Sequence, residues 1–272
     1  MIFDYSGTLS LEAPRFGRPG SLIRALEESG LAALGVSTPE IFWEKIVNPT
    51  WIEGSTTAIG YRQVMANRIA ALQLAPDASI NEIEAAAACF VDAYLSASRI
   101  DPRWRPVLER LSKQTAAITV IATDHYAEAT ERITGYLDSW GIPARKTGGD
   151  EKPLLSAAEK FFVANSADLG VWKADRRFWE ILKSRHPLAT VRMILLIDDF
   201  GFNEASEDLY GGQAKVIARQ EKTIATLEEA FHASVEAAPF CLSLEVEGCD
   251  EAGGRLIAET VSRIDEFLER TC

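Results

Sequence analysis

Short apolar runs alternate with amphipathic helical patterns over much of the chain. Runs rich in β-branched and other apolar residues are typical of buried strands, and they lie at 1–3, 117–122, 161–164, 193–197 and 214–218. Apolar residues recur at helical spacing in 106–113, 127–140, 175–184 and 223–233. This alternation predicts an α/β fold in which a Rossmann-like, mostly parallel sheet carries helices on both faces.

Helical patterns alone fill the chain between the first two predicted strands. They cover 22–29, 40–47, a segment from Ser55 or Thr56 to Leu72, and 79–96. The segment 11–20 contains two prolines and two glycines and is expected to be a hinge loop. We therefore expect an all-helical cap over 12–101, inserted into an α/β core formed by 1–11 and 102–272. The end of the chain predicts an edge strand over 240–246 and a terminal helix over 253–270.

The chain has 272 residues and a formal net charge of −12. This acidity argues against nucleic-acid binding, which needs clustered Lys and Arg, but a small phosphorylated ligand can still find a locally positive site. The four cysteines have no ligand-like spacing, so we expect neither zinc nor a disulfide framework, and a reduced, cytoplasmic setting is the simplest interpretation. No apolar run approaches the roughly 18 residues of a membrane span, and the composition sets no oligomeric state.

Polar residues follow the predicted strands at the places where parallel sheets bind ligands. Asp4 follows the first strand, Thr123 ends the second, and Asp198 and Asp199 end the fourth. Because the carboxyl ends of parallel strands meet at one edge, we expect these side chains to lie close together. Asp4 is a candidate nucleophile in an anion-binding turn that continues through residues 5–8.

Lys173 lies just before the helical pattern at 175–184 and supplies a cation for this edge. Its ammonium would neutralise the nucleophile and the attacked group, and Thr123 would donate a hydrogen bond to an anionic oxygen. The adjacent acids at 198 and 199 would hold a hard cation such as Mg²⁺. Lys152, followed by Pro153, competes for the role of Lys173, but it lies in an expected added loop at 144–156.

These residues form four motifs that resemble those of the haloacid dehalogenase-like hydrolase superfamily. The motifs occur in the family's order and are Asp4-Tyr5-Ser6-Gly7-Thr8, the strand from Val120 to Thr123, the lysine segment from Gly170 to Asp175, and Ile197-Asp198-Asp199 with Asn203. The resemblance covers about residues 1–233 and is to members with a helical cap inserted after the first core strand. It implies a Mg²⁺-dependent phosphatase that acts on a small phosphorylated metabolite through an aspartyl phosphate.

The resemblance also implies which residues form the site. The catalytic positions would be Asp4, Ser6, Thr123 and Lys173. The metal would be bound by Asp4, Asp198, Asp199 and the backbone carbonyl of Ser6. Gly7 and Thr8 of the first motif would contact the substrate. Their places in the chain make Asp124 and His125, which follow Thr123, further candidates for substrate contact, and the hinge arginines Arg15 and Arg18 could reach a remote anion.

Ser6 departs from the family pattern, in which an Asp at this place is the general acid and base. General acid–base catalysis contributes about 10²- to 10⁴-fold, so its loss weakens the prediction of ordinary phosphomonoester hydrolysis. Three features would keep hydrolysis possible: a substrate with a good leaving group such as an acyl phosphate, His125 titrating near neutrality, or a cap residue such as Glu53 reaching the site.

Two other functions remain open at this point. A catalytically attenuated member would bind a phosphorylated ligand or a partner protein through the same pocket. A phosphonate- or halide-cleaving member would break a bond from carbon to another element, and phosphonate cleavage would need a Schiff-base lysine from the cap, for which Lys45 is the candidate.

Overall fold

A six-stranded parallel sheet forms the centre of the α/β part of the protein. The computed structural model describes residues 1–114, 117–148, 160–205, 207–208, 213–242 and 249–271. The strand order is β3-β4-β2-β1-β5-β6, with every neighbouring pair parallel. The strands are β1 (Ile2–Phe3), β2 (Thr119–Thr123), β3 (Arg145–Lys146), β4 (Phe161–Asn165), β5 (Met193–Asp198) and β6 (Ser234–Pro239).

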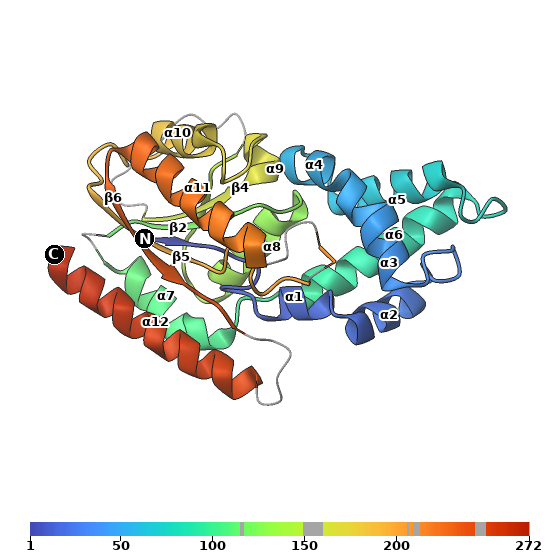
Figure 1. Cartoon of the computed structure of the whole chain (residues 1–272), viewed down its shortest axis with the longest axis horizontal. Helices are drawn as coiled ribbons and strands as arrows, with labels where there is room; N and C mark the ends of the chain where they lie inside the picture. Colours follow the sequence, from blue (N-terminus) through green and yellow to red (C-terminus); the bar gives the residue numbers. More distant parts are fainter. Residues whose placement is uncertain (115–116, 149–159, 206, 209–212, 243–248, 272) are drawn as a thin grey trace.

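Helices cover both faces of this sheet (Figure 1). One face packs against α7 (Arg105–Ser112), α8 (Glu128–Ser139) and α12 (Cys249–Thr271), and the other packs against α10 (Arg176–Arg185) and α11 (Gln213–Phe231). Successive strand residues alternate between the two cores, so that Ile2 joins the α10 and α11 side and Phe3 joins the α7 side. The predicted α/β architecture is confirmed.

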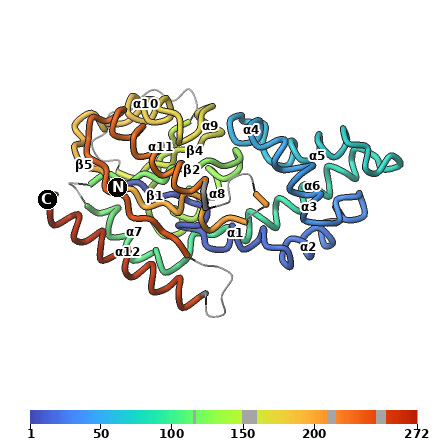
Figure 2. Tube along the Cα trace, viewed as in Figure 1, coloured from blue at the N-terminus to red at the C-terminus, as the bar shows by residue number. Residues whose placement is uncertain are grey.

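The chain between β1 and β2 is helical, with its own apolar core. Its elements are α1 (Glu12–Phe16), α2 (Pro19–Glu28), α3 (Pro39–Ile41), the π-helix η1 (Phe42–Val47), α4 (Asn48–Thr56), α5 (Tyr61–Leu72) and α6 (Ile80–Ala97). The short η2 (Pro102–Trp104) then leads to α7, and α9 (Ser166–Leu169) follows β4. Figures 1 and 2 show these inserted helices beside the sheet. Tyr126 and Ala205 join their core, so the insertion packs on loops of the sheet. The limits 12–101 for a cap domain stay a prediction.

Two expectations for the inserted segment are wrong. The segment 11–20 is not simply a hinge loop, because α1 and the start of α2 lie in it; Pro14 and Pro19 fall in first helical turns, where a missing N–H costs nothing. No helix begins at Ser55 or Thr56, since Ser55 bonds to the carbonyl of Trp51 inside α4 and α5 begins after Gly60.

The predicted strands near the end of the chain also need correction. Residues 214–218 belong to the helix α11, with Val216 buried and Ile217 exposed; a short apolar run does not distinguish a strand from one face of a helix. The edge strand is β6 at Ser234–Pro239 rather than 240–246, because this is the segment in register with β5; of the predicted stretch, 243–246 lies outside the described residues. The two-residue strand β3 consists of Arg145 and Lys146. Because it has no apolar residue, the hydrophobic pattern does not predict it.

Candidate active site

Three carboxylates meet at the carboxyl edge of the sheet. Phe3 of β1 is in register with Ile197 of β5, so the residues that follow each of them lie side by side. The side chains of all three are buried: Asp4, Asp198 and Asp199. One carboxylate oxygen from each residue lies within 4.8 Å of one oxygen from each of the other two. The sequence prediction that these acids come together agrees with the structure.

Lys173 joins this cluster from the loop before α10. Its Nζ donates hydrogen bonds to Asp4 Oδ1 at 2.5 Å and to Asp198 Oδ2 at 2.9 Å. Its backbone N–H donates to Asp124 Oδ1 at 2.9 Å, and its carbonyl accepts from the Trp179 indole at 2.8 Å. The ammonium is therefore fixed between two carboxylates from neighbouring strands. Lys152, the competing lysine, lies outside the described residues.

The carboxylates at this edge of the sheet outnumber the ammonium group that pairs with them. Burial raises the pKa of Asp4 well above its ordinary range, against the opposing effect of Lys173. Burial, with nearby Glu204, raises the pKa of Asp199 to about 8. Three buried carboxylates face one ammonium, and a divalent cation would offset the remaining charge and favour the ionised acids. The donor set of carboxylate oxygens therefore fits Mg²⁺.

The turn after β1 holds Asp199 in place. Gly7 has a φ of +77°, and a Cβ on it would lie 2.6 Å from Asp199 Oδ2. Thr8 Oγ1 accepts a hydrogen bond from the Asp199 N–H at 3.1 Å, and the Asn203 amide donates to the Gly7 carbonyl at 2.6 Å. Gly7 and Thr8 are not among the described residues that line the pocket. Their contacts position the acidic pair, whereas a direct contact with substrate stays a prediction.

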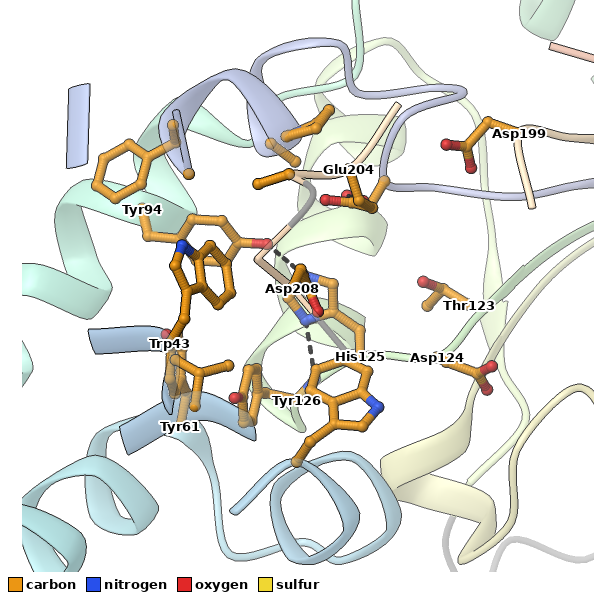
Figure 3. Close-up of a pocket in the computed structure, with 18 of the residues that line it drawn as sticks. Trp43, Tyr61, Tyr94, Thr123, Asp124, His125, Tyr126, Asp199, Glu204 and Asp208 are labelled. Carbon is orange, nitrogen blue, oxygen red and sulfur yellow. Dashed lines mark hydrogen bonds between the residues drawn. The ribbon is translucent and has the colours of Figure 1, made fainter. Parts of the chain in front are cut away.

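Ser6 contacts an acid that the sequence analysis missed. Its Oγ donates a hydrogen bond to Glu204 Oε1 at 2.6 Å, and both residues line the pocket. Figure 3 shows Glu204 among the lining residues. Burial, followed by the charge of Asp208, raises the pKa of Glu204 to about 8. Glu204 directly follows Asn203 of the fourth motif, but only the fold brings it to Ser6, which is 198 residues away. The expected Glu53 is exposed and is not among the described lining residues.

Thr123, Asp124 and His125 line the same pocket at the end of β2. His125 Nδ1 accepts a hydrogen bond from the Tyr126 N–H at 2.8 Å, so Nε2 carries the proton and pairs with the Tyr94 hydroxyl at 2.9 Å. Burial lowers the pKa of His125 to about 4. The ring is therefore neutral at pH 7 with its lone pair engaged, and it does not provide the near-neutral base that was expected.

The buried, neutral His125 makes stability depend on pH. The unfolded chain binds a proton on this ring below its ordinary pKa of about 6.5, whereas the folded protein does so only below about 4. We expect unfolding free energy to fall by roughly 3 kcal/mol between these pH values from this residue alone. Urea unfolding at pH 7 and pH 4 should show a smaller pH-dependent loss in His125→Gln.

His232→Asn provides the control, because this histidine is exposed and Asn tolerates its φ of +51°. An equal pH-dependent loss in wild type and His125→Gln would contradict the assignment.

Neither of the two predicted hinge arginines is among the described residues that line the pocket. Arg15 forms an ion pair with Glu12 on α1 and is not among the described residues that line the pocket. Arg18 Nη2 contacts the Asn203 carbonyl at 3.5 Å, and its charge acts on Glu204. A role for Arg15 in substrate binding therefore has no support from its position.

The pocket runs from the carboxylates into the inserted helices. Its volume is about 90 Å³, and a water-sized group needs about 10–15 Å³. Aromatic side chains from η1, α4, α5 and α6 line the part that lies within the insertion. The ligand that fits is therefore small.

No protein-family model matches the sequence, and no curated protein matches it. Two solved structures are similar in overall fold. A 2-haloacid dehalogenase from Pseudomonas syringae pv. tomato has a TM-score of 0.49 and 18% identity, over 90% of this chain and 89% of that one. A protein described as a HAD-hydrolase, YfnB from Bacillus subtilis bound to magnesium, has a TM-score of 0.46 and 13% identity, over 90% of this chain and 88% of that one. At these values neither activity transfers to this chain.

No helix in the described part of the chain combines the length and the apolarity that crossing a bilayer requires.

Proposed function

We propose that this protein is a Mg²⁺-dependent phosphatase of small phosphorylated metabolites that works through a phosphorylated Asp4. The observation that carries the proposal is the buried Asp4 carboxylate, which is hydrogen-bonded to Lys173 and lies beside Asp198 and Asp199 in a pocket. A pocket that only bound phosphate would need cations rather than a buried carboxylate at this place.

In the first step an oxygen of Asp4 attacks phosphorus, and the bond between phosphorus and the leaving alcohol oxygen breaks. Lys173 is hydrogen-bonded to Asp4 and would hold the nucleophile in position, and Thr123, which lines the pocket, would donate to an anionic phosphoryl oxygen. Asp4, Asp198 and Asp199 would hold Mg²⁺, which supplies charge neutralisation. In the second step water attacks phosphorus, which releases inorganic phosphate and restores the Asp4 carboxylate.

We propose Glu204 as the proton donor and acceptor that Ser6 cannot be. Its carboxyl group touches the Ser6 hydroxyl, at the place where the family carries its acid and base. Glu204 would give a proton to the leaving oxygen in the first step and take one from water in the second. This assignment keeps the proton count balanced over the two steps.

Glu204→Gln tests this assignment. We expect phosphate release from alkyl phosphates to fall by about 100-fold, the lower end of what a general acid or base contributes. With acetyl phosphate, the first step, which releases acetate, should slow less than with alkyl phosphates, because acetate leaves without a proton. Glu207→Gln removes an exposed acid three residues away and should keep wild-type rates. Equal rates in Glu204→Gln and wild type on alkyl phosphates would remove Glu204 from the mechanism.

The experiment that tests the proposed function is phosphate release from a panel of phosphate monoesters and acyl phosphates, with Mg²⁺ and with chelator. Release that requires Mg²⁺ supports the phosphatase. Absence of release over the whole panel from folded protein would overturn it and favour the attenuated, ligand-binding alternative. Phosphonate cleavage has less support, because Lys45 is exposed on η1 and is not among the described residues that line the pocket.

A further inference from the structure

The pocket has a second part that the proposed phosphoryl chemistry does not use. Apolar side chains from α2, η1, α4 and α6 line it. We call these side chains the apolar wall: Leu22, Phe42, Trp43, Val47, Trp51 and Phe90. Figure 3 shows Trp43 on the side of the pocket opposite Asp199. A substrate whose phosphate lies at Asp4 would therefore place its remote group against the apolar wall.

The apolar wall is packed firmly against its surroundings. Phe42 meets Trp43 edge to face with ring centroids 5.1 Å apart, and it packs on Phe90 at the same distance. Gly17 at the end of α1 allows a close approach to Trp43, because a Cβ there would lie 3.1 Å from Trp43 Cζ2. Side chains packed in this way are held in position before a ligand binds, which lowers the entropic cost of binding.

The tyrosine hydroxyls beside the apolar wall already have partners within the protein. The Tyr94 hydroxyl pairs with His125 Nε2 at 2.9 Å, and the Tyr61 and Tyr126 hydroxyls interact with each other. Burial raises the pKa of all three hydroxyls well above their ordinary value, so they are neutral at pH 7. A polar ligand group could bond to them only by displacing these partners.

The charged side chains of the pocket are also engaged. Glu204 is hydrogen-bonded to Ser6, and its pKa of about 8 leaves it largely protonated at pH 7. Asp208 lines the pocket and has a partner of its own in the chain. Lys173 is the one Lys or Arg among the described lining residues, and its ammonium is bonded to two carboxylates. These groups therefore offer no ready counter-charge to a remote group.

We infer that the remote group is a short, uncharged alkyl chain, so that the substrates are phosphate esters of small apolar alcohols. A charged or hydroxylated remote group would lose its water and meet side chains that are apolar or already paired, which is costly. Each methylene placed against the apolar wall instead favours binding. The volume of about 90 Å³ is shared with the phosphoryl group and admits a short chain only. This inference rests on the proposed function.

The test compares propyl phosphate with 2-hydroxyethyl phosphate and 2-aminoethyl phosphate, which have chains of the same length. We expect kcat/KM for propyl phosphate to be at least about fivefold higher than for either, the lower end of the cost of burying an unpaired hydroxyl. The polar alcohols are the better leaving groups, so the chemical step alone would favour their esters. Equal values, or a preference for a polar ester, would overturn the inference and leave the phosphatase intact.

Trp43→Phe and Trp140→Phe form the matched pair of variants. Each exchanges an indole for a smaller ring, but Trp43 lines the pocket, whereas Trp140 is half-buried at the end of α8 and is not among the described lining residues. In wild type we expect kcat/KM to rise by about fourfold for each methylene from methyl to propyl phosphate. The best chain length should increase in Trp43→Phe and stay unchanged in Trp140→Phe. The same best length in both variants would contradict the apolar wall.

Calorimetry with two phosphonates separates the inference from the proposed function. Butylphosphonate has a methylene in place of the bridging oxygen of propyl phosphate, and 3-hydroxypropylphosphonate is the matching analogue of 2-hydroxyethyl phosphate. Binding of butylphosphonate that is at least about fivefold tighter supports the apolar wall even if no ester is hydrolysed. Equal affinities, or tighter binding of the hydroxylated compound, with hydrolysis of esters would overturn the apolar wall alone.

Discussion

Asp4→Asn is expected to abolish Mg²⁺-dependent phosphate release, with a loss of roughly 10⁴-fold or more, as when a covalent nucleophile is removed. The amide has nearly the same shape as the carboxylate but is a poor nucleophile. It also removes one of three buried like charges, so we expect the variant to stay folded. Phosphate release and urea unfolding, measured on the same preparation, check both parts.

Asp138→Asn is the matched control for this prediction. Asp138 is exposed on α8, and its substitution should leave both phosphate release and stability unchanged. Release from Asp4→Asn at the wild-type rate would show that the nucleophile is another group. Unfolding of Asp4→Asn would make that variant uninformative about chemistry, and Asp4→Ser, which has no carboxylate either, would then decide the point.

Lys173→Met is expected to lower the unfolding free energy by about 3–5 kcal/mol at pH 7 without Mg²⁺. The Lys173 ammonium is the partner of two buried carboxylates, and its removal leaves Asp4 and Asp198 without this charge. Mg²⁺ should recover part of the loss, since it offsets the same charges. Urea unfolding with Mg²⁺ and with chelator measures both effects.

Lys146→Met separates this effect from the loss of any lysine. Lys146 forms an ion pair with Glu131 in which the two side chains are 41% and 72% exposed. Exposed pairs contribute at most about 1 kcal/mol, so this variant should unfold close to wild type. Equal stability of Lys173→Met and Lys146→Met would show that the buried cluster is not held by the ammonium.

The carboxylate cluster could be predicted from the sequence because strand ends are local features. Asp4 and the pair at 198 and 199 each follow a short apolar run, and parallel pairing of β1 with β5 then brings them together. Lys173 could be predicted because a helix begins just after it, at Arg176. In each case a single stretch of chain identifies the residue, and the parallel order of the strands then brings these residues together.

Glu204 and the aromatic side chains that line the pocket could not be predicted in this way. The contact of Glu204 with Ser6 depends on how the loop after β5 returns to the turn after β1. The aromatic lining comes from η1, α4, α5, α6 and the loop after β2, and each of these side chains has the periodicity of an ordinary core residue. Tertiary packing determines which core residues face a cavity, and local sequence patterns do not predict which residues these are.

His125 illustrates the opposite error. Its place just after Thr123 indicated a site residue, and it does line the pocket. Its chemistry differs from the expectation because Tyr94 and the Tyr126 N–H occupy both ring nitrogens and burial lowers the pKa to about 4. Position along a strand predicted the neighbourhood of this ring but not its protonation.

The central claim is that Asp4 becomes phosphorylated, and trapping that species tests it most directly. Glu204→Gln would be mixed with acetyl phosphate and Mg²⁺, quenched in acid, and digested for mass spectrometry. Acetate leaves without a proton, whereas hydrolysis of the aspartyl phosphate would lack its base, so a phosphoryl group should accumulate on the peptide at Asp4. Mg²⁺-dependent phosphate release from wild type without any phosphoryl group on Asp4, in either protein, would contradict the account.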